Sequence, residues 1–121
     1  MILRSVIATA LVGAVSVGLS STAKAAPTLY FAVVNADGSL ARHSDKVKSR
    51  RLDFGQYSVT FPVNVSKCAY SGTVGSSSTT PEQGGSTNMN PLGGNTKGVF
   101  VKIGSQGTLV DRGFYLIVLC P

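Results

Sequence analysis

The chain has 121 residues, of which 43% are hydrophobic and 13% charged, and its formal net charge is +6. This length accommodates one domain with a modest core, and one histidine with two cysteines is too few for a Cys/His-rich metal cluster. The excess of basic residues does not by itself indicate nucleic-acid binding, since no nucleic-acid-binding motif accompanies it.

The first 25 residues have the pattern of a secretory signal peptide. A short basic segment ends at Arg4, an apolar stretch runs from Val6 to Leu19, and small residues flank a cleavage point between Ala25 and Ala26. The alternative is a membrane anchor, but the stretch is short and interrupted by glycine and serine. Cleavage leaves one domain, residues 26–121, with nine basic and five acidic residues and a net charge of +4. We therefore expect a secreted, cell-surface or periplasmic protein without a transmembrane segment in the mature chain.

The first half of the domain predicts short strands joined by tight turns. Residues 28–34 are too apolar on both faces for an exposed strand, and a turn at 35–38 joins them to a second strand at 39–42. Residues 46–52 predict a strand near a sheet edge, where lysine and arginine discourage pairing with other chains. Residues 56–61 alternate most clearly, with Tyr57, Val59 and Phe61 on the core side.

The two cysteines predict one disulfide, Cys68–Cys120, as is typical of an exported chain. In a strand at 68–74, Cys68 shares a face with Tyr70 and Val74, so the disulfide should lie on the core side and join this strand to the C-terminal one. A pair of free thiols used for metal binding or catalysis is the alternative, and no CxxC motif supports it.

Residues 75–97 are dominated by serine, glycine, threonine and asparagine and predict a long flexible loop with little to bury. A loop of this length within a compact domain is either functional or disordered. Residues 98–103 predict the next strand, 104–107 a turn, and 108–111 a continuation of the sheet.

The C-terminal segment carries six apolar residues in succession, Phe114 to Leu119, followed by Cys120 and Pro121. It predicts a strand buried on both faces, although a short buried helix gives the same signal. Altogether we count seven or eight short strands and no amphipathic helix. The fold class is therefore predicted to be all-β, a small antiparallel β-sandwich or barrel with one disulfide.

No catalytic, metal-binding or cofactor-binding constellation stands out. His43, Ser44 and Asp45 are the residue types of a catalytic triad, but a triad is assembled from separate elements and these three are adjacent. The acidic residues are scattered and match no metal-binding motif. We therefore expect no enzyme activity, no metal and no cofactor.

A basic segment is the best candidate for a binding surface. It could contact an anionic cell-surface polymer, a glycan or nucleic acid, and its members are Arg42, Lys46, Lys48, Arg50 and Arg51. Alternation places Lys46, Lys48 and Arg50 on one face of a strand. Aromatic platforms for single-stranded nucleic acid could come from Tyr30, Tyr57 and Tyr70. The alternative is an edge strand whose charged side chains only keep the protein soluble by preventing pairing with other chains.

Four motifs together resemble a small domain found in many bacterial exported or hypothetical proteins. They read V-V-N-x-D-G-x-L-A-R at 33–42, G-x-Y-x-V-x-F at 55–61, V-x-x-C-A-Y at 65–70 and D-R-x-F-x-L-x-V-x-C at 111–120. The match covers nearly all of the mature chain, and the chain departs from the pattern most in residues 75–97. The resemblance implies a bacterial exported β-domain and carries over no catalytic residues.

The leading functional hypothesis is a non-enzymatic structural or interaction domain that self-associates, because its strands carry more apolar surface than one thin sandwich hides. The alternative is a cationic module that binds an anionic polymer. A weaker alternative is a hydrolase that uses His43, or a protease inhibitor that uses the loop at 75–97.

Overall fold

The computed structural model describes residues 26–121, and the predicted signal peptide lies outside them. This part of the chain forms nine strands and no helix. Sheet A has the spatial order β2 (Leu40–His43), β1 (Thr28–Val34), β9 (Phe114–Cys120) and β5 (Ala69–Val74). Sheet B has the order β3 (Lys48–Asp53), β4 (Gln56–Thr60), β7 (Gly98–Ser105) and β6 (Ser86–Pro91), and the short β8 (Thr108–Leu109) also pairs with β7. All paired strands are antiparallel.

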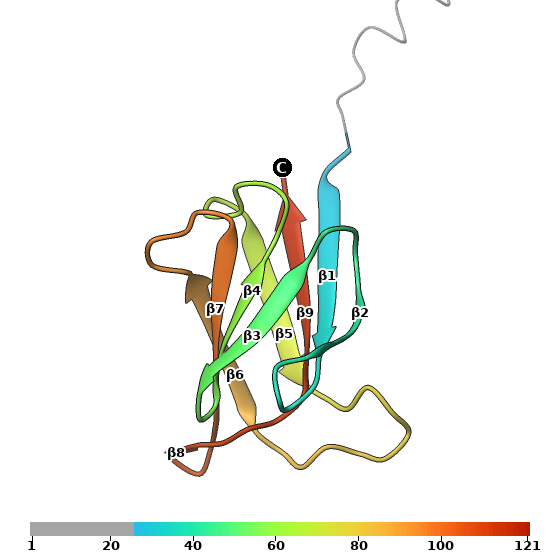
Figure 1. Cartoon of the computed structure of the whole chain (residues 1–121), viewed down its shortest axis with the longest axis vertical. Helices are drawn as coiled ribbons and strands as arrows, with labels where there is room; N and C mark the ends of the chain where they lie inside the picture. Colours follow the sequence, from blue (N-terminus) through green and yellow to red (C-terminus); the bar gives the residue numbers. More distant parts are fainter. Residues whose placement is uncertain (1–25) are drawn as a thin grey trace, which may run out of the picture.

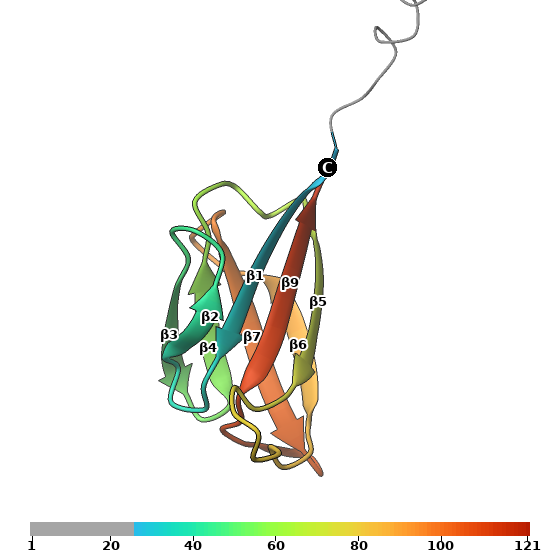
Figure 2. The ribbon, with the colours of Figure 1, turned by 90° about the vertical axis from the view of Figure 1, so that its right-hand side faces the viewer.

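The two sheets form the two layers of a sandwich (Figures 1 and 2). In Figure 2, β9 lies between β1 and β5 in one layer, and β3, β4, β7 and β6 form the other. The predicted all-β class is confirmed, with nine strands in place of seven or eight. The basic strand β3 is an edge strand of sheet B, as its composition predicts.

The core lies between the sheets and follows the alternation of the strands. From sheet B, Tyr57 and Val59 point inward and are fully buried, and from sheet A the inward side chains include Phe114 and Leu116. The rings of Tyr57 and Phe114 meet edge to face with centroids 5.1 Å apart, which joins the layers by a favourable aromatic contact. The predicted inward face of residues 56–61 is therefore confirmed.

The C-terminal strand is buried on one face only, so the prediction that it is buried on both faces is wrong. Along β9, Phe114, Leu116 and Val118 are buried, whereas Ile117 and Leu119 are each 44% exposed. On the neighbouring β1, the outward Leu29 and Phe31 are exposed in the same way, whereas the outward Val33 is buried. The reason is architectural: sheet B covers the inner face of sheet A, and no strand of the described chain packs on the outer face of these two strands.

The prediction of one continuous loop at 75–97 is also wrong. Strand β6 lies within this range and pairs with β7 along its whole length, from Ser86↔Gly104 to Pro91↔Val99. Its inward side chains, Thr87 and Met89, are half-buried, and the others are exposed. Backbone pairing holds this strand, and it requires no run of apolar residues.

The predicted disulfide Cys68–Cys120 is confirmed. Its Cα atoms are 4.5 Å apart, and the adjacent register pair is Ala69↔Leu119, so it ties the beginning of β5 to the end of β9 on the core side. A disulfide is consistent with an oxidising compartment. It also clamps the edge strand β5 to the centre of sheet A.

Candidate interaction surfaces

The outer face of sheet A carries four large apolar side chains, which we call the apolar quartet: Leu29, Phe31, Ile117 and Leu119. The register places Leu29 directly opposite Leu119 and Phe31 directly opposite Ile117. All four are exposed, from 37% for Phe31 to 56% for Leu29. Cross-strand pairs of this kind stabilise a sheet, but burial of the part of each side chain that is still exposed would contribute roughly 1 kcal/mol more. The quartet therefore has the composition of a core without a covering layer.

The surroundings of the quartet leave it accessible. On the adjacent β5, the outward side chains are short: Ala69, Ser71 and Thr73. On the other side lies a hollow of about 310 Å³, whose lining includes Phe31, Ile117, Val33, Tyr115 and Arg42. The quartet thus forms an apolar strip, bordered on one side by the short side chains of β5 and on the other by this hollow.

Polar contacts close one end of this strip. Arg42 donates hydrogen bonds to the Ser77 carbonyl at 3.2 Å and to the Tyr115 hydroxyl at 3.1 Å. The Tyr115 hydroxyl in turn donates to the Ser76 carbonyl at 2.8 Å. Further along, the backbone N–H of Gly113 donates to the Glu82 carboxylate at 2.7 Å. The segment 75–85, seen below the sandwich in Figure 1, is therefore bonded to the ends of β2 and β9.

The outer face of sheet B is polar and cationic. Its register aligns Arg50, Ser58, Phe100 and Asn90 in one row across four strands, and Asp53, Gln56, Lys102 and Asn88 in the next. Two hollows open on this face. One of about 340 Å³ is lined by Lys48, Arg50, Ser58 and Thr60 among others, and one of about 380 Å³ by Lys102, Asn88, Ser86 and Thr108 among others.

The structure does not bring the five predicted basic residues together. Arg42 belongs to sheet A, and Lys46 lies in the turn before β3 with φ of 60°. Arg51 points away from the stripe and pairs with Asp111, leaving Lys48 and Arg50 on the outer face of sheet B. Of the predicted stripe of Lys46, Lys48 and Arg50, the last two therefore share a face, and Lys46 lies outside the strand. Lys102 is the cation that sequence reasoning missed; its alternation with buried Val101 and Ile103 in 98–103 was the available signal.

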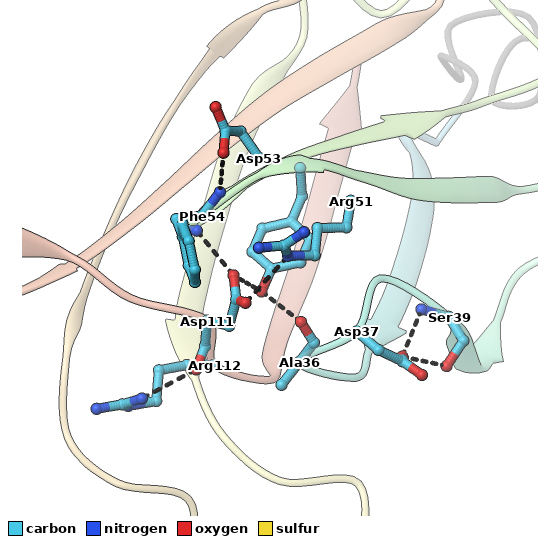
Figure 3. Close-up of polar contacts among 10 residues, drawn as sticks. Ala36, Asp37, Ser39, Arg51, Asp53, Phe54, Asp111 and Arg112 are labelled. Atoms are coloured by element: carbon cyan, nitrogen blue, oxygen red, sulfur yellow. Dashed lines mark hydrogen bonds and ion pairs between the residues drawn. The ribbon is translucent and has the colours of Figure 1, made fainter.

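Arg51 takes part in a network around the Asp111 carboxylate (Figure 3). Asp111 accepts hydrogen bonds from Arg51 Nε at 3.0 Å, the Gly55 N–H at 2.8 Å and the Tyr57 hydroxyl at 3.3 Å. Partial burial acts to raise the pKa of Asp111, but these hydrogen bonds and the guanidinium charge outweigh it and lower the pKa. Burial, then the Asp111 charge, raise the pKa of Tyr57 to about 12. This network joins β3 and β4 to the segment before β9.

Tyr57 also bonds the turn that follows β1. Its hydroxyl donates to the Ala36 carbonyl at 2.6 Å, so one side chain of sheet B reaches both the β1–β2 turn and Asp111. Among the described residues, no buried side-chain polar atom lacks a hydrogen-bond partner, which is typical of a structural network. It holds the two sheets in position.

The other candidate residues from the sequence contact the backbone or the core. The Ser44 hydroxyl bonds the backbone of Phe31, accepting from its N–H at 3.0 Å and donating to its carbonyl at 3.2 Å, while His43 Nδ1 lies 2.7 Å from the Ser44 carbonyl. Ser44 therefore extends the sheet. Tyr57 is fully buried, and Tyr30 and Tyr70 pack against the core, so the prediction that tyrosines form an aromatic platform is wrong.

Residues 26–121 contain no group of three or more His, Cys, Asp or Glu side chains placed to hold a metal ion. Within the same residues, no helix is long and apolar enough to cross a membrane.

Comparisons of the chain with family models, with curated proteins and with solved structures found no match. The resemblance to a bacterial exported domain therefore stays a prediction. The candidate surfaces rest on the geometry of the two sheets: an apolar outer face on sheet A and a cationic outer face on sheet B.

Proposed function

We propose that the mature domain is an exported, non-enzymatic interaction module that self-associates through the apolar quartet of sheet A. The observation that carries this proposal is the pair of facing apolar contacts, Leu29 with Leu119 and Phe31 with Ile117, left exposed on the two central strands of a sheet. Apolar patches of a few hundred Å² on small proteins often mark interaction sites. The signal-peptide pattern and the disulfide support export to the cell surface, the periplasm or the medium.

A second copy of the same chain is the occupant that this face fits best. The quartet contains no charged or polar side chain, so a copy related by a two-fold axis presents a surface of the same chemistry. Leu119 does not line the hollow beside the quartet, whereas Phe31 and Ile117 do. Leu119 of one copy can therefore pack into the hollow of the other copy, against Phe31 and Ile117. The short side chains of β5 allow a second sheet to approach to about 10 Å, the usual spacing between packed sheets.

The extent of the strip also agrees with a dimer. A standard interface buries about 800 Å² on each partner. The quartet supplies an apolar centre, and Ala69, Ser71, Thr73 and Tyr115 surround it with small or polar groups. An apolar centre within a polar rim is the usual anatomy of a protein interface.

Sedimentation velocity on the oxidised mature protein tests the proposal. The wild type should shift from monomer to dimer as its concentration rises. The variant Phe31→Thr/Ile117→Thr should weaken association at least roughly tenfold, since each copy loses two apolar side chains from the contact. Threonine is β-branched and favours strands, as isoleucine does, so the melting temperature should change little.

The matched control is Val63→Thr/Leu109→Thr. These side chains are 37% and 38% exposed and lie outside the quartet, so this variant should dimerise like the wild type. A wild type that remains monomeric at every concentration would contradict the proposal, and so would equal association of the quartet variant and the control.

A further inference from the structure

We propose that the outer face of sheet B binds a linear anionic polysaccharide. This inference goes beyond self-association and does not depend on it, because the two functions use opposite faces of the sandwich. The binding region consists of the two hollows, which we call the Arg50 hollow and the Lys102 hollow, and of Phe100 between them in the register.

The outer face of sheet B carries cations that no carboxylate of the described chain neutralises directly. Within residues 26–121 the one ion pair is Arg51–Asp111, so Lys48, Arg50 and Lys102 have no carboxylate partner. No acidic residue lines either hollow. Of the acidic side chains, Asp53 lies at the end of β3 in the row of Gln56 and Lys102, and the other four lie in the connections between strands: Asp37, Asp45, Glu82 and Asp111. Three cations against one carboxylate still give the face a net positive field that attracts anions.

An aromatic ring and side-chain amides lie between these cations. Phe100 is partly exposed and points outward between Ser58 on β4 and Asn90 on β6, and an aromatic ring can pack against the C–H face of a sugar. The neighbouring row supplies amides from Gln56 and Asn88, which both donate and accept hydrogen bonds and so match sugar hydroxyls. A simple inorganic anion would make no use of this ring or these amides.

The distance between the two hollows suits a chain-like ligand. Arg50 and Lys102 lie two strands apart and one row apart along the strands, so their Cα atoms are separated by about 12 Å at ordinary strand spacing. A short stretch of a linear polysaccharide can span this distance and place an acidic group at each hollow. A guanidinium binds a carboxylate through two parallel hydrogen bonds, and a lysine binds it as a point charge.

Nucleic acid is the other polyanion that a cationic sheet could bind. Single-stranded nucleic acid is usually held by several aromatic rings on which successive bases stack. The tyrosines that could have formed such a series face the core, and Phe100 is the one aromatic side chain in the rows of sheet B described above. The face thus favours hydrogen bonding to hydroxyls over base stacking.

The test uses the oxidised mature protein and four probes in titration calorimetry: polygalacturonate, alginate, chondroitin sulfate and the single strand dT30. A fifth probe, fully methyl-esterified polygalacturonate, retains the sugar chain without its charge. We expect binding to at least one acidic polysaccharide that is at least tenfold tighter than binding to dT30. If polygalacturonate is bound, esterification should weaken binding by at least tenfold. The association-deficient variant Phe31→Thr/Ile117→Thr should bind like the wild type.

Two pairs of variants locate the site. Lys48→Gln/Lys102→Gln removes one cation from each hollow, and its control Lys46→Asn/Lys67→Gln removes the same charge elsewhere; asparagine tolerates the positive φ of position 46. We expect at least a tenfold loss for the first variant and less than a twofold loss for the control. Phe100→Ala should weaken polysaccharide binding while leaving any residual dT30 binding unchanged. Absence of binding to all three acidic polysaccharides would overturn the proposal, as would dT30 binding of equal strength or equal losses in both double variants.

Discussion

The two outer faces of the sandwich are built from strands of similar length, yet their outward side chains differ in kind. On sheet A the central strands β1 and β9 present Leu29, Phe31, Ile117 and Leu119, and no charge lies among them. On sheet B the outward face carries Lys48 and Arg50 on the edge strand β3 and Lys102 on the central strand β7, with amides and hydroxyls around them. A solvated sheet normally alternates apolar inward and polar outward residues. Sheet B follows this rule, and sheet A departs from it at its centre.

The difference is what the two proposed functions require. Apolar side chains exposed to water have an unfavourable free energy, which burial against a partner removes. A face of unpaired cations remains hydrated and attracts polyanions. If two copies associate through sheet A, both cationic faces point outward. The dimer would then hold two separate segments of an anionic chain, which raises apparent affinity without new contacts.

The disulfide gives the largest expected effect, and it belongs to sheet A. Replacing both cysteines (Cys68→Ser/Cys120→Ser) should lower the free energy of unfolding by about 4 kcal/mol, the chain-entropy value for a 52-residue separation. Loss of the clamp would free β5 from β9 and expose more of the apolar strip, so the variant should also aggregate. Urea unfolding measures the change, and reduced wild type should match the variant. An unchanged free energy of unfolding would contradict this role.

The Asp111 network gives the next effect and tests how sheet B is joined to the rest of the fold. Asp111→Asn removes the charge that Arg51 and the Gly55 N–H recognise, and should destabilise the protein by about 2 kcal/mol. Because the folded-state pKa of Asp111 is lowered, its contribution is present above the ordinary value of 3.8 and is lost as the pH falls through the folded-state pKa.

Chemical denaturation between pH 2.5 and pH 7 measures this contribution. The variant should show a smaller loss of stability on acidification than the wild type. The control is Asp45→Asn, an exposed carboxylate between β2 and β3, for which we expect no difference. Identical pH profiles for wild type and Asp111→Asn would contradict the proposed role of the network.

Salt should act in opposite directions on the two faces. Two copies with a net charge of +4 each repel one another, so raising the salt from 0.15 to 0.5 M should strengthen self-association by roughly twofold. The same change should weaken polysaccharide binding at least roughly threefold, because it screens the attraction of Lys48, Arg50 and Lys102. Sedimentation and calorimetry measure the two effects. A change of the same sign in both would contradict the division between an apolar and a cationic face.

The contacts at the end of the apolar strip give the smallest effect. Tyr115→Phe removes the hydrogen bond to the Ser76 carbonyl and the one from Arg42, and should reduce stability by at most about 1 kcal/mol. Hydrogen exchange should become faster within residues 75–85, with little change in self-association. The control Tyr70→Phe removes a bond to the Val65 carbonyl and should leave exchange in 75–85 unchanged. Equal exchange in wild type and Tyr115→Phe would show that these bonds do not order the segment.

Much of the fold could be predicted because strand alternation and turn chemistry are local. The inward face of 56–61, the edge position of β3 and the Cys68–Cys120 pairing followed from periodicity, charge and cysteine count. Strand β6 could not be found in this way, because its backbone pairing with β7 is specified by the partner strand and its side chains are mostly polar.

The candidate surfaces were harder to predict for a related reason. A run such as Phe114–Leu119 looks the same whether one or both faces are covered, because coverage depends on which layers exist. Likewise, a list of basic residues does not say which of them share a face. Alternation separates Arg51 from Arg50, but only the structure pairs Arg51 with Asp111, and only the register joins Arg50 to Lys102 two strands away.

Methyl NMR spectra of the wild-type mature protein over a dilution series test the central claim most directly. If the quartet is the self-association face, the methyl signals of Leu29, Ile117 and Leu119 should shift with concentration. Those of the core residues Leu116 and Ile103, and of Leu109 on β8, should remain constant. Signals that do not change with concentration, or changes centred on sheet B, would contradict it.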